Sequence, residues 1–178
     1  MLEITKGTPT DIDELEQLYD CLNDYLGSHT NYPGWKKGIY PTREDAERGI
    51  AEGTLFVARE GNKEDNKIVG TVILNHEPET GYSQAAWHED LEDNEYLVIH
   101  TLAVHPDCFN QGIGRLLMEL AINCAARTSM KAIRLDVYEK NIPAIKLYEK
   151  MGFSYIGTVD LGYGMHGLDW FRLYEKVL

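Results

Sequence analysis

Residues 96–104, YLVIHTLAV, are the stretch that most limits how this chain folds. Only His100 and Thr101 interrupt an otherwise apolar run, which is too apolar for a strand at an exposed sheet edge. We therefore expect a central strand that is covered on both faces. Covering layers of helices predict a mixed α/β layered sandwich.

Hydrophobic periodicity predicts the other elements around this strand. Short apolar or alternating runs predict strands, whereas apolar residues three and four positions apart predict helices. Together they give a mixed central sheet of about six to seven strands, in a single domain over residues 1–178. Strands are expected at residues 2–6, 54–60, 67–75, 131–138, 153–160 and 169–178, and helices at 11–26, 43–50, 113–124 and 142–151.

Polar residues mark the ends of several of these elements. Thr10, Thr42 and Asn141 each stand just before an expected first helical turn and are predicted N-caps. The polar stretch 61–66 is an expected turn between two strands, and residues 76–95 are a long polar excursion before the central strand.

Charge and composition limit the function classes. The chain carries 29 acidic and 17 basic side chains, a formal net charge of -12, which disfavours binding to the phosphate backbone of nucleic acids. No run approaches the roughly 18 apolar residues that span a bilayer, and the first residues lack the pattern of a signal peptide. Three cysteines without metal-binding spacing favour a reduced, cytoplasmic setting and no metal site.

Residues 108–117, CFNQGIGRLL, place two glycines just before a helical pattern. A loop that leaves a buried strand and enters a helix presents free N–H groups, and glycine lets that backbone approach a phosphate. Gly114 is followed by Arg115 and Leu116, not by the Lys-Ser/Thr of a nucleotide-hydrolysing loop. The third glycine of a dinucleotide-binding fingerprint is also absent. The pattern indicates a phosphate loop without lysine, although two glycines alone are also typical of a tight turn.

Two motifs, LAVHPDCFNQGIGRLL and, about 25 residues later, NIPAIKLYEKMGF, together resemble the GNAT superfamily of acyl-CoA N-acyltransferases. In LAVHPDCFNQGIGRLL, Gly112 and Gly114 match the two small positions of the family's phosphate loop. Phe109 departs from the pattern, since the family favours Arg or Gln there, and this bears on loop geometry and cofactor affinity rather than on cofactor identity. The resemblance is strong over residues 66–157 and implies the GNAT fold. The second motif, NIPAIKLYEKMGF, matches at Asn141, Ala144, Tyr148, Gly152 and Phe153.

The resemblance also implies acetyl-CoA as the acyl donor, with no metal. Backbone groups of Leu102 and Val104 would align the pantetheine arm of coenzyme A and the acyl carbonyl, while Tyr148 would lie beside the thioester sulfur. The cofactor-binding residues implied in this way are Leu102, Ala103, Val104, Asn110, Gln111, Gly112, Ile113, Gly114, Arg115, Asn141, Ala144 and Tyr148.

Direct acyl transfer through a tetrahedral intermediate needs a base for the ammonium, a donor for the carbonyl oxygen and an acid for the thiolate. Tyr148 is the candidate acid, because a phenol is protonated at neutral pH; a core tyrosine with a satisfied hydroxyl is the alternative. His100 and Glu95 are the candidate bases. His100 titrates near neutrality and resembles in position the strand histidines of arylalkylamine acetyltransferases. A strand histidine with one hydrogen bond is an equally good interpretation.

Members of the superfamily build the acceptor pocket from the N-terminal helices, their loop and the outer strands. Tyr32, Trp35, Tyr40 and Trp87 are the candidate substrate-binding residues here, because aromatic walls suit amines and cations. Five acids in the seven residues Glu89–Glu95 would attract an ammonium group. Such acidic runs and loop aromatics are also typical of solvated loops.

The sequence therefore predicts a cytoplasmic N-acetyltransferase that moves an acetyl group from acetyl-CoA to a primary amine of a small molecule. The alternatives are acetylation of peptide or protein amines, a non-catalytic acyl-CoA sensor and a purely structural domain. No nucleic-acid or membrane partner is expected. A homodimer is an open alternative to a monomer, and strand 169–178 is a candidate contributor to it.

Overall fold

The computed structural model describes residues 1–61 and 66–178. Residues 62–65, most of the expected polar turn, lie outside the described residues. The chain divides into two compact units. The first comprises Met1–Asn31, Trp35–Leu74 and Thr101–Met118, and the second comprises Tyr32–Gly34, Asn75–His100 and Glu119–Leu178. The expected single domain over residues 1–178 stays a prediction.

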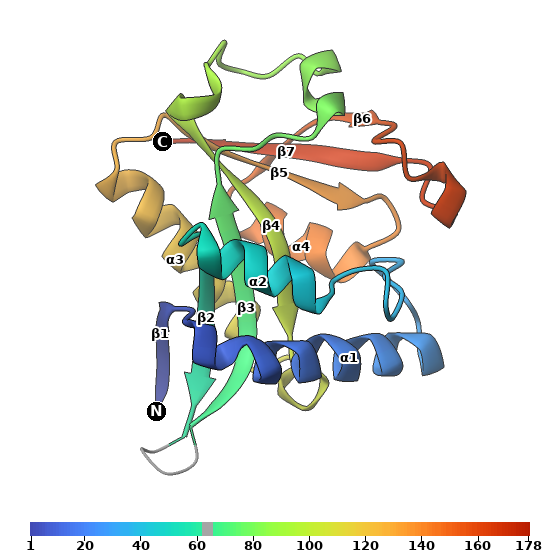
Figure 1. The fold of residues 1–178 in the computed structure, drawn as a ribbon. Coiled ribbons are helices and arrows are strands. Elements are labelled where there is room, and N and C mark those ends of the chain that lie inside the picture. Colours follow the sequence, from blue (N-terminus) through green and yellow to red (C-terminus); the bar gives the residue numbers. More distant parts are fainter. Residues whose placement is uncertain (62–65) are drawn as a thin grey trace. The chain divides into compact units, whose positions relative to one another are not determined.

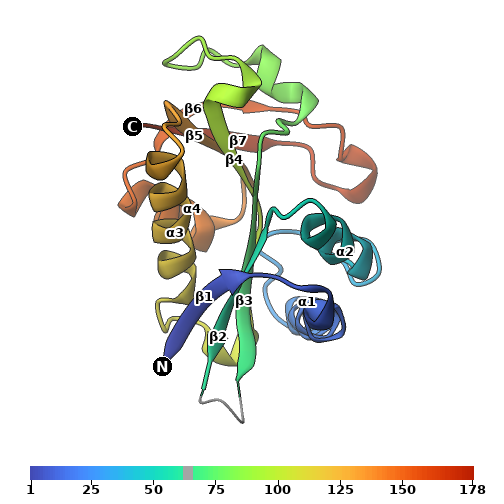
Figure 2. The same cartoon turned by 60° about the vertical axis from the view of Figure 1, so that its left-hand side comes forward.

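The first unit is an antiparallel sheet covered by two helices. Strand β1 (Leu2–Lys6) pairs with β2 (Leu55–Glu60), which pairs with β3 (Lys67–Asn75). Helices α1 (Ile12–Ser28) and α2 (Arg43–Ala51) lie on the same face of these strands (Figures 1 and 2). Helical spacing predicts an apolar face on α1 made of Ile12, Leu15, Leu18, Tyr19 and Leu22. The structure confirms four of these residues, which are at most 4% exposed, whereas Ile12 is only partly buried.

The predicted caps of α1 and α2 have different outcomes. Thr10 does not cap α1, because a 3-10 turn over Pro9–Asp11 precedes the helix and begins the winding earlier. The Asp11 carboxylate instead accepts from the Thr8 amide at 2.8 Å. Thr42 is confirmed as the N-cap of α2, where Asp45 accepts from the Thr42 amide at 2.8 Å.

The second unit contains a mixed sheet. The first residues of β4 (Tyr96–Val104) run parallel to β5 (Ala132–Tyr138), and β7 (Phe171–Val177) pairs antiparallel with both β5 and β6 (Ser154–Val159). Strand β4 contributes residues to both units. The order of the strands is β1-β2-β3-β4-β5-β7-β6. The seven strands of the described chain agree with the predicted mixed sheet.

Two helices follow the sequence motifs. Helix α3 (Ile113–Arg127) begins directly after the glycine loop, with Ile113 and Leu117 buried. The helical spacing of apolar residues predicts one buried stripe, and the prediction is wrong at Leu116, which is 38% exposed; the predicted stripe is Ile113, Leu116, Leu117, Leu120, Ala121 and Cys124. Asn141 caps α4 (Ile142–Lys150) as predicted. No helix in the described part of the chain is long and apolar enough to cross a bilayer.

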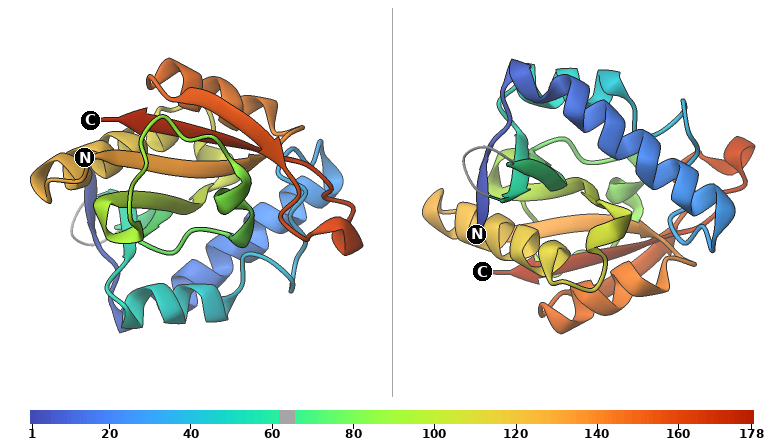
Figure 3. Two further views of the ribbon diagram at one scale, coloured as in Figure 1. Left: turned by 90° about the horizontal axis from the view of Figure 1, so that it is seen from above. Right: turned by 90° about the horizontal axis from the view of Figure 1, so that it is seen from below.

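Residues 76–95, the polar excursion, lie against β5 and β7 (Figure 3). The excursion contains two short 3-10 helices, Thr80–Gln84 and Asp93–Glu95. Its apolar side chains close a second core with those of β4, β5, β6 and β7. The excursion is therefore part of the second unit's structure and not a solvated loop along its whole length.

Candidate functional site

The loop between β4 and α3 in the first unit has the backbone of an anion-binding turn. Asn110 has a φ of 61° and Gly112 a φ of 83°, the left-handed conformation that Asn and Gly adopt most readily. The amide of Leu116 donates to the Gly112 carbonyl at 3.1 Å, which starts the intrahelical bonds of α3. The amides of Ile113 and Gly114 therefore belong to the first turn, where the helix supplies no acceptor and adds partial positive charge. These groups fit a pyrophosphate.

Phe109 gives this loop an apolar anchor. Its ring packs edge-on against Tyr25 of α1, with 5.4 Å between centroids, at the border of the first unit's core. Gln111 donates from its side chain to the Asp107 carbonyl at 3.0 Å. The loop shape is thus held by packing and by its own chain, which explains how the loop forms without the Arg or Gln that the family favours at position 109.

Strand β4 changes direction at Thr101. Its φ is 49°, an unfavourable left-handed conformation for a β-branched residue. The Tyr40 and Thr101 hydroxyls are hydrogen-bonded to each other. Trp35 packs edge-on against Tyr40, with 5.5 Å between ring centroids. Of these two aromatic residues, both expected to wall an acceptor site, Tyr40 therefore contacts the segment of β4 that precedes Leu102, and Trp35 packs against Tyr40.

Tyr148 lies on α4 in the second unit and is 6% exposed. Burial raises the pKa of its phenol, and the negative charge of Asp136 raises it further. A phenol in this environment stays protonated at every physiological pH. Asn141, at the start of the same helix, accepts from the Ala144 amide at 3.5 Å, so its side chain already orders the first turn.

The two predicted bases have definite partners in the second unit. Glu95 is ion-paired with Lys131, and this hydrogen bond lowers the pKa of the carboxyl. A carboxylate with a lowered pKa is a weaker base, so the geometry disfavours Glu95. The His100 Nε2 lies 3.0 Å from the Glu77 carbonyl, which can only accept, so this nitrogen carries the proton of that hydrogen bond.

Asp136 is a candidate that the sequence interpretation missed. It lies on β5, opposite Leu173 of β7, and its carboxylate accepts from the Tyr82 hydroxyl at 2.8 Å. Burial raises its pKa to about 6, while the Tyr82 hydrogen bond lowers it in part. A carboxyl that titrates near pH 6 can accept a proton at neutral pH. The available signal was the pair of charged residues, Arg134 and Asp136, in an otherwise apolar strand.

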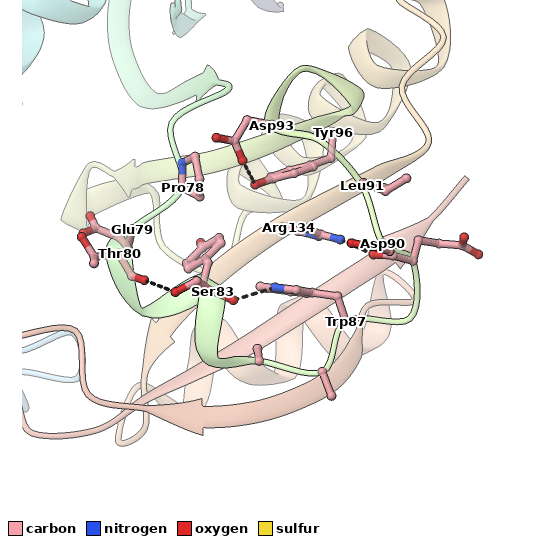
Figure 4. A pocket seen from close by; sticks show the side chains of 14 residues that line it. Pro78, Glu79, Thr80, Ser83, Trp87, Asp90, Leu91, Asp93, Tyr96 and Arg134 are labelled. Atoms are coloured by element: carbon pink, nitrogen blue, oxygen red, sulfur yellow. Dashed lines mark hydrogen bonds between the residues drawn. The ribbon is translucent and has the colours of Figure 1, made fainter.

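A pocket of about 620 Å³ opens under the excursion of the second unit (Figure 4). Arg134 crosses it between two rings, with its guanidinium carbon 4.3 Å from the Trp87 centroid and 4.1 Å from that of Tyr96. Trp87 therefore contacts a cation of the chain itself. Tyr32, the remaining predicted aromatic, is 39% exposed. The acids that line the pocket are Glu79, Glu89, Asp90 and Asp93.

Within residues 1–61 and 66–178, no three His, Cys, Asp or Glu side chains are grouped closely enough to hold a metal ion. The three cysteines, Cys21, Cys108 and Cys124, are free thiols. Burial raises the pKa of Cys108, which disfavours its thiolate.

The mixed sheet with its helices and the glycine loop that opens α3 agree with the GNAT fold that the sequence motifs imply. The model of the Acetyltransferase (GNAT) family matches residues 15–153, and the chain belongs to this family. The fold is also similar to a crystal structure of a GNAT-family acetyltransferase from Streptococcus agalactiae. That structure has a TM-score of 0.76 and 24% identity, with 99% of this chain and 95% of the other covered.

Relatives in sequence differ in what their names say they acetylate. Streptothricin acetyltransferase of Streptomyces lavendulae is 36% identical over 75 residues, which are 42% of this chain and 36% of the relative. The [ribosomal protein bS18]-alanine N-acetyltransferase of Escherichia coli K12 is 38% identical over 56 residues, 32% of this chain and 38% of the relative. The chain spans between 20% and 47% of the length of the curated relatives it matches.

Proposed function

We propose that the protein is an acyl-CoA-dependent acyltransferase that moves an acetyl group from acetyl-CoA to a primary amine of a small molecule. The observation that carries this proposal is that the second unit holds a buried phenol, Tyr148, under the influence of the Asp136 charge, while the Asp136 carboxylate accepts from the Tyr82 hydroxyl at 2.8 Å. Acyl transfer to an amine needs such an acid and such a base. Family membership supplies the reaction class.

The first unit carries the groups suited to the donor. The amides of Asn110 to Arg115, at the start of α3, would hold the pyrophosphate of acetyl-CoA through local N–H groups rather than through net charge. Leu102, Ala103 and Val104 would align the pantetheine arm along β4, and the Leu102 amide would donate to the carbonyl oxygen. Acetyl-CoA, when bound, supplies an activated acyl group as its thioester.

The second unit carries the groups suited to proton transfer. Asp136 would take a proton from the acceptor ammonium, which leaves a neutral amine whose nitrogen lone pair forms the new C–N bond. The carbonyl electron pair moves to the oxygen to give the tetrahedral intermediate; when the C=O bond re-forms, the C–S bond breaks and Tyr148 would give its proton to the departing thiolate. The second proton of the amine and the proton held by Asp136 leave to solvent, and the phenolate recovers its proton from solvent. Asp136 replaces Glu95 in this role, and His100 stays the alternative base.

Charge and size around the pocket favour a small cationic acceptor. A volume of about 620 Å³ lies in the range of small-molecule sites. Four carboxylates line it, whereas Arg134, the one basic residue among the described lining residues, is neutralised by Glu175 at 2.8 Å. A primary ammonium would be attracted to this field. Peptide or protein amines are the second candidate, because one relative is named for acetylating a ribosomal protein.

A release assay for the coenzyme A thiol tests this function. The protein is incubated with acetyl-CoA and, separately, with small primary amines, diamines and peptides that have free N-termini. We expect turnover with small amines and its loss in Asp136→Asn. Turnover with peptides alone would replace the small-molecule acceptor by a peptide, and tight binding of coenzyme A without turnover on any amine would identify a sensor. A cytoplasmic location and a homodimer stay predictions.

A further inference from the structure

A continuous chain of contacts in the second unit leads from a buried ion pair to Asp136. Arg134 and Glu175 are 3% and 1% exposed, and their side chains are joined at 2.8 Å. The Arg134 guanidinium also donates to the Glu89 carbonyl at 2.7 Å, which ties the excursion to β5. Trp87 stacks on the outer face of this guanidinium (Figure 4).

Trp87 continues the chain toward the candidate base. Its Nε1–H donates to the Tyr82 carbonyl at 2.8 Å, and the two rings are in contact with 5.2 Å between centroids. Tyr82 is 3% exposed, and its hydroxyl donates to the Asp136 carboxylate at 2.8 Å. Both ends of Tyr82, backbone and hydroxyl, are therefore fixed.

We propose that Trp87 is a positioning residue: held on Arg134, it fixes the backbone of Tyr82 and so keeps the Tyr82 hydroxyl on the Asp136 carboxylate. This inference rests on the proposed function only in taking Asp136 as the base. It gives Trp87 a role through Tyr82, in place of direct contact with the acceptor. The phenol favours the ionised carboxylate, since a hydrogen bond to the charged form stabilises that form.

Other groups of the second unit also act on Asp136 or on its neighbours. Tyr148 of α4 and Tyr163, between β6 and β7, are both affected by the Asp136 charge. Glu79, in the excursion, has its pKa raised by burial and by Asp136, while His100 of β4 acts on Glu79 in the opposite direction. All of these groups are present both in wild type and in the variants of Trp87 and Tyr82. A change in the Asp136 pKa in those variants therefore reports the contribution of Trp87 and Tyr82.

The test measures the Asp136 titration directly, by carbon NMR of its side-chain carboxyl in the free protein, and the pH profile of kcat/KM. Tyr82→Phe removes the donor and is expected to raise the Asp136 pKa by roughly one pH unit. Trp87→Leu is also expected to raise the Asp136 pKa and to move the acidic limb of kcat/KM to higher pH. In the Tyr82→Phe background, Trp87→Leu should cause no further rise in the Asp136 pKa. Trp170→Phe, a change at an exposed tryptophan of the same unit, is the matched control and should leave both unchanged.

The positioning role would be overturned if Trp87→Leu left the Asp136 pKa unchanged. It would also be overturned if Trp87→Leu raised that pKa equally in wild type and in Tyr82→Phe. If Trp87→Leu does not fold, Trp87→Phe carries the test, because it keeps a ring for Arg134 but has no N–H for the Tyr82 carbonyl. A different result would contradict the proposed function: an Asp136→Asn variant that keeps the full kcat/KM of wild type and the acidic limb of its pH profile. The NMR titration still decides the inference in that case.

Discussion

Tyr148 shows how burial prepares a single side chain for chemistry. Its phenol is kept neutral by desolvation and by the Asp136 charge, so it can donate a proton but not act as a base. We expect Tyr148→Phe to lower kcat about 100-fold with little change in the KM for acetyl-CoA, because the hydroxyl acts when the thiolate leaves. Steady-state kinetics measure both constants.

Tyr155→Phe is the matched control for that change, since Tyr155 lies on β6 and is 53% exposed. It should leave kcat and KM unchanged. Full kcat in Tyr148→Phe would remove the acid role.

Asp136 links the candidate site to stability. Its folded pKa of about 6 lies above the ordinary 3.8, so the folded protein binds this proton more tightly than the unfolded chain does. The resulting stability is fully present below about pH 4 and is lost as pH rises through 6. Asp136→Asn stays neutral at both pH values. At pH 7.5 we expect its free energy of unfolding to exceed that of wild type by at most about 3 kcal/mol, which raises its unfolding temperature, and at pH 4 we expect no difference.

Thermal unfolding at the two pH values measures this difference, and the exposed Asp169→Asn serves as its control. An Asp136→Asn variant that is less stable than wild type at pH 7.5 but equal to it at pH 4 would contradict the assigned environment.

At the scale of residues, sequence motifs predicted what depends on local spacing. Tyr148, Asn141 and the glycines of the loop could be proposed as site residues because their positions follow the spacing of one helix or one turn; their roles stay predictions. Asp136 was missed, since its pKa depends on burial beneath an excursion that lies 41 to 60 residues earlier in the chain. Trp87 was singled out as an aromatic, but its partner Arg134 could not be known without the fold.

At the scale of elements, β4 depends on a contact from the loop before α2. The left-handed φ of Thr101 is unfavourable, and the Tyr40 hydroxyl holds that residue. We expect Tyr40→Phe to lower the free energy of unfolding by about 1 kcal/mol in wild type and by almost nothing in Thr101→Gly, which has no hydroxyl partner and no strain at this φ. Urea unfolding of the four proteins measures the coupling, and equal costs in both backgrounds would show that Tyr40 does not act through Thr101.

The loop that opens α3 makes a separate prediction about the donor. Gly112→Ala places a side chain at a φ of 83°, which strains the loop that presents the amides. We expect its dissociation constant for acetyl-CoA to rise at least tenfold, as measured by calorimetry. Gly167→Ala is the control, because Gly167 has a φ of 76° and, like Gly112, open space around an added Cβ, but lies between β6 and β7. Equal losses in the two variants would show that strain alone, not the loop, weakens binding.

Most elements could be predicted from periodicity, because their apolar faces repeat at the spacing of a helix or a strand. The start of α1 could not, since Pro9 and Asp11 begin the winding earlier than a cap at Thr10 would allow. The polar character of the excursion could be predicted, but its packing could not, because Tyr82 is buried, and Trp87 partly buried, against strands that are distant in sequence.

For the whole molecule, an acidic chain and a phosphate-binding loop are compatible. The net charge of -12 is spread over both units, whereas the amides that fit a pyrophosphate are fixed at one helix start. The same acidity favours a cationic acceptor over an anionic one. Under the proposed function, the donor and the acceptor would therefore be recognised by different means, local backbone groups and overall charge.

Transfer of the acetyl group to a small primary amine can be measured in one competition experiment. The protein is incubated with isotope-labelled acetyl-CoA and an equimolar mixture of small primary amines and peptides with free N-termini, and the products are analysed by mass spectrometry. We expect label on the amino group of one or more small amines, and we expect Tyr148→Phe to slow this labelling about 100-fold. Label found only on peptide N-termini, or on no amine, would contradict the proposed transfer.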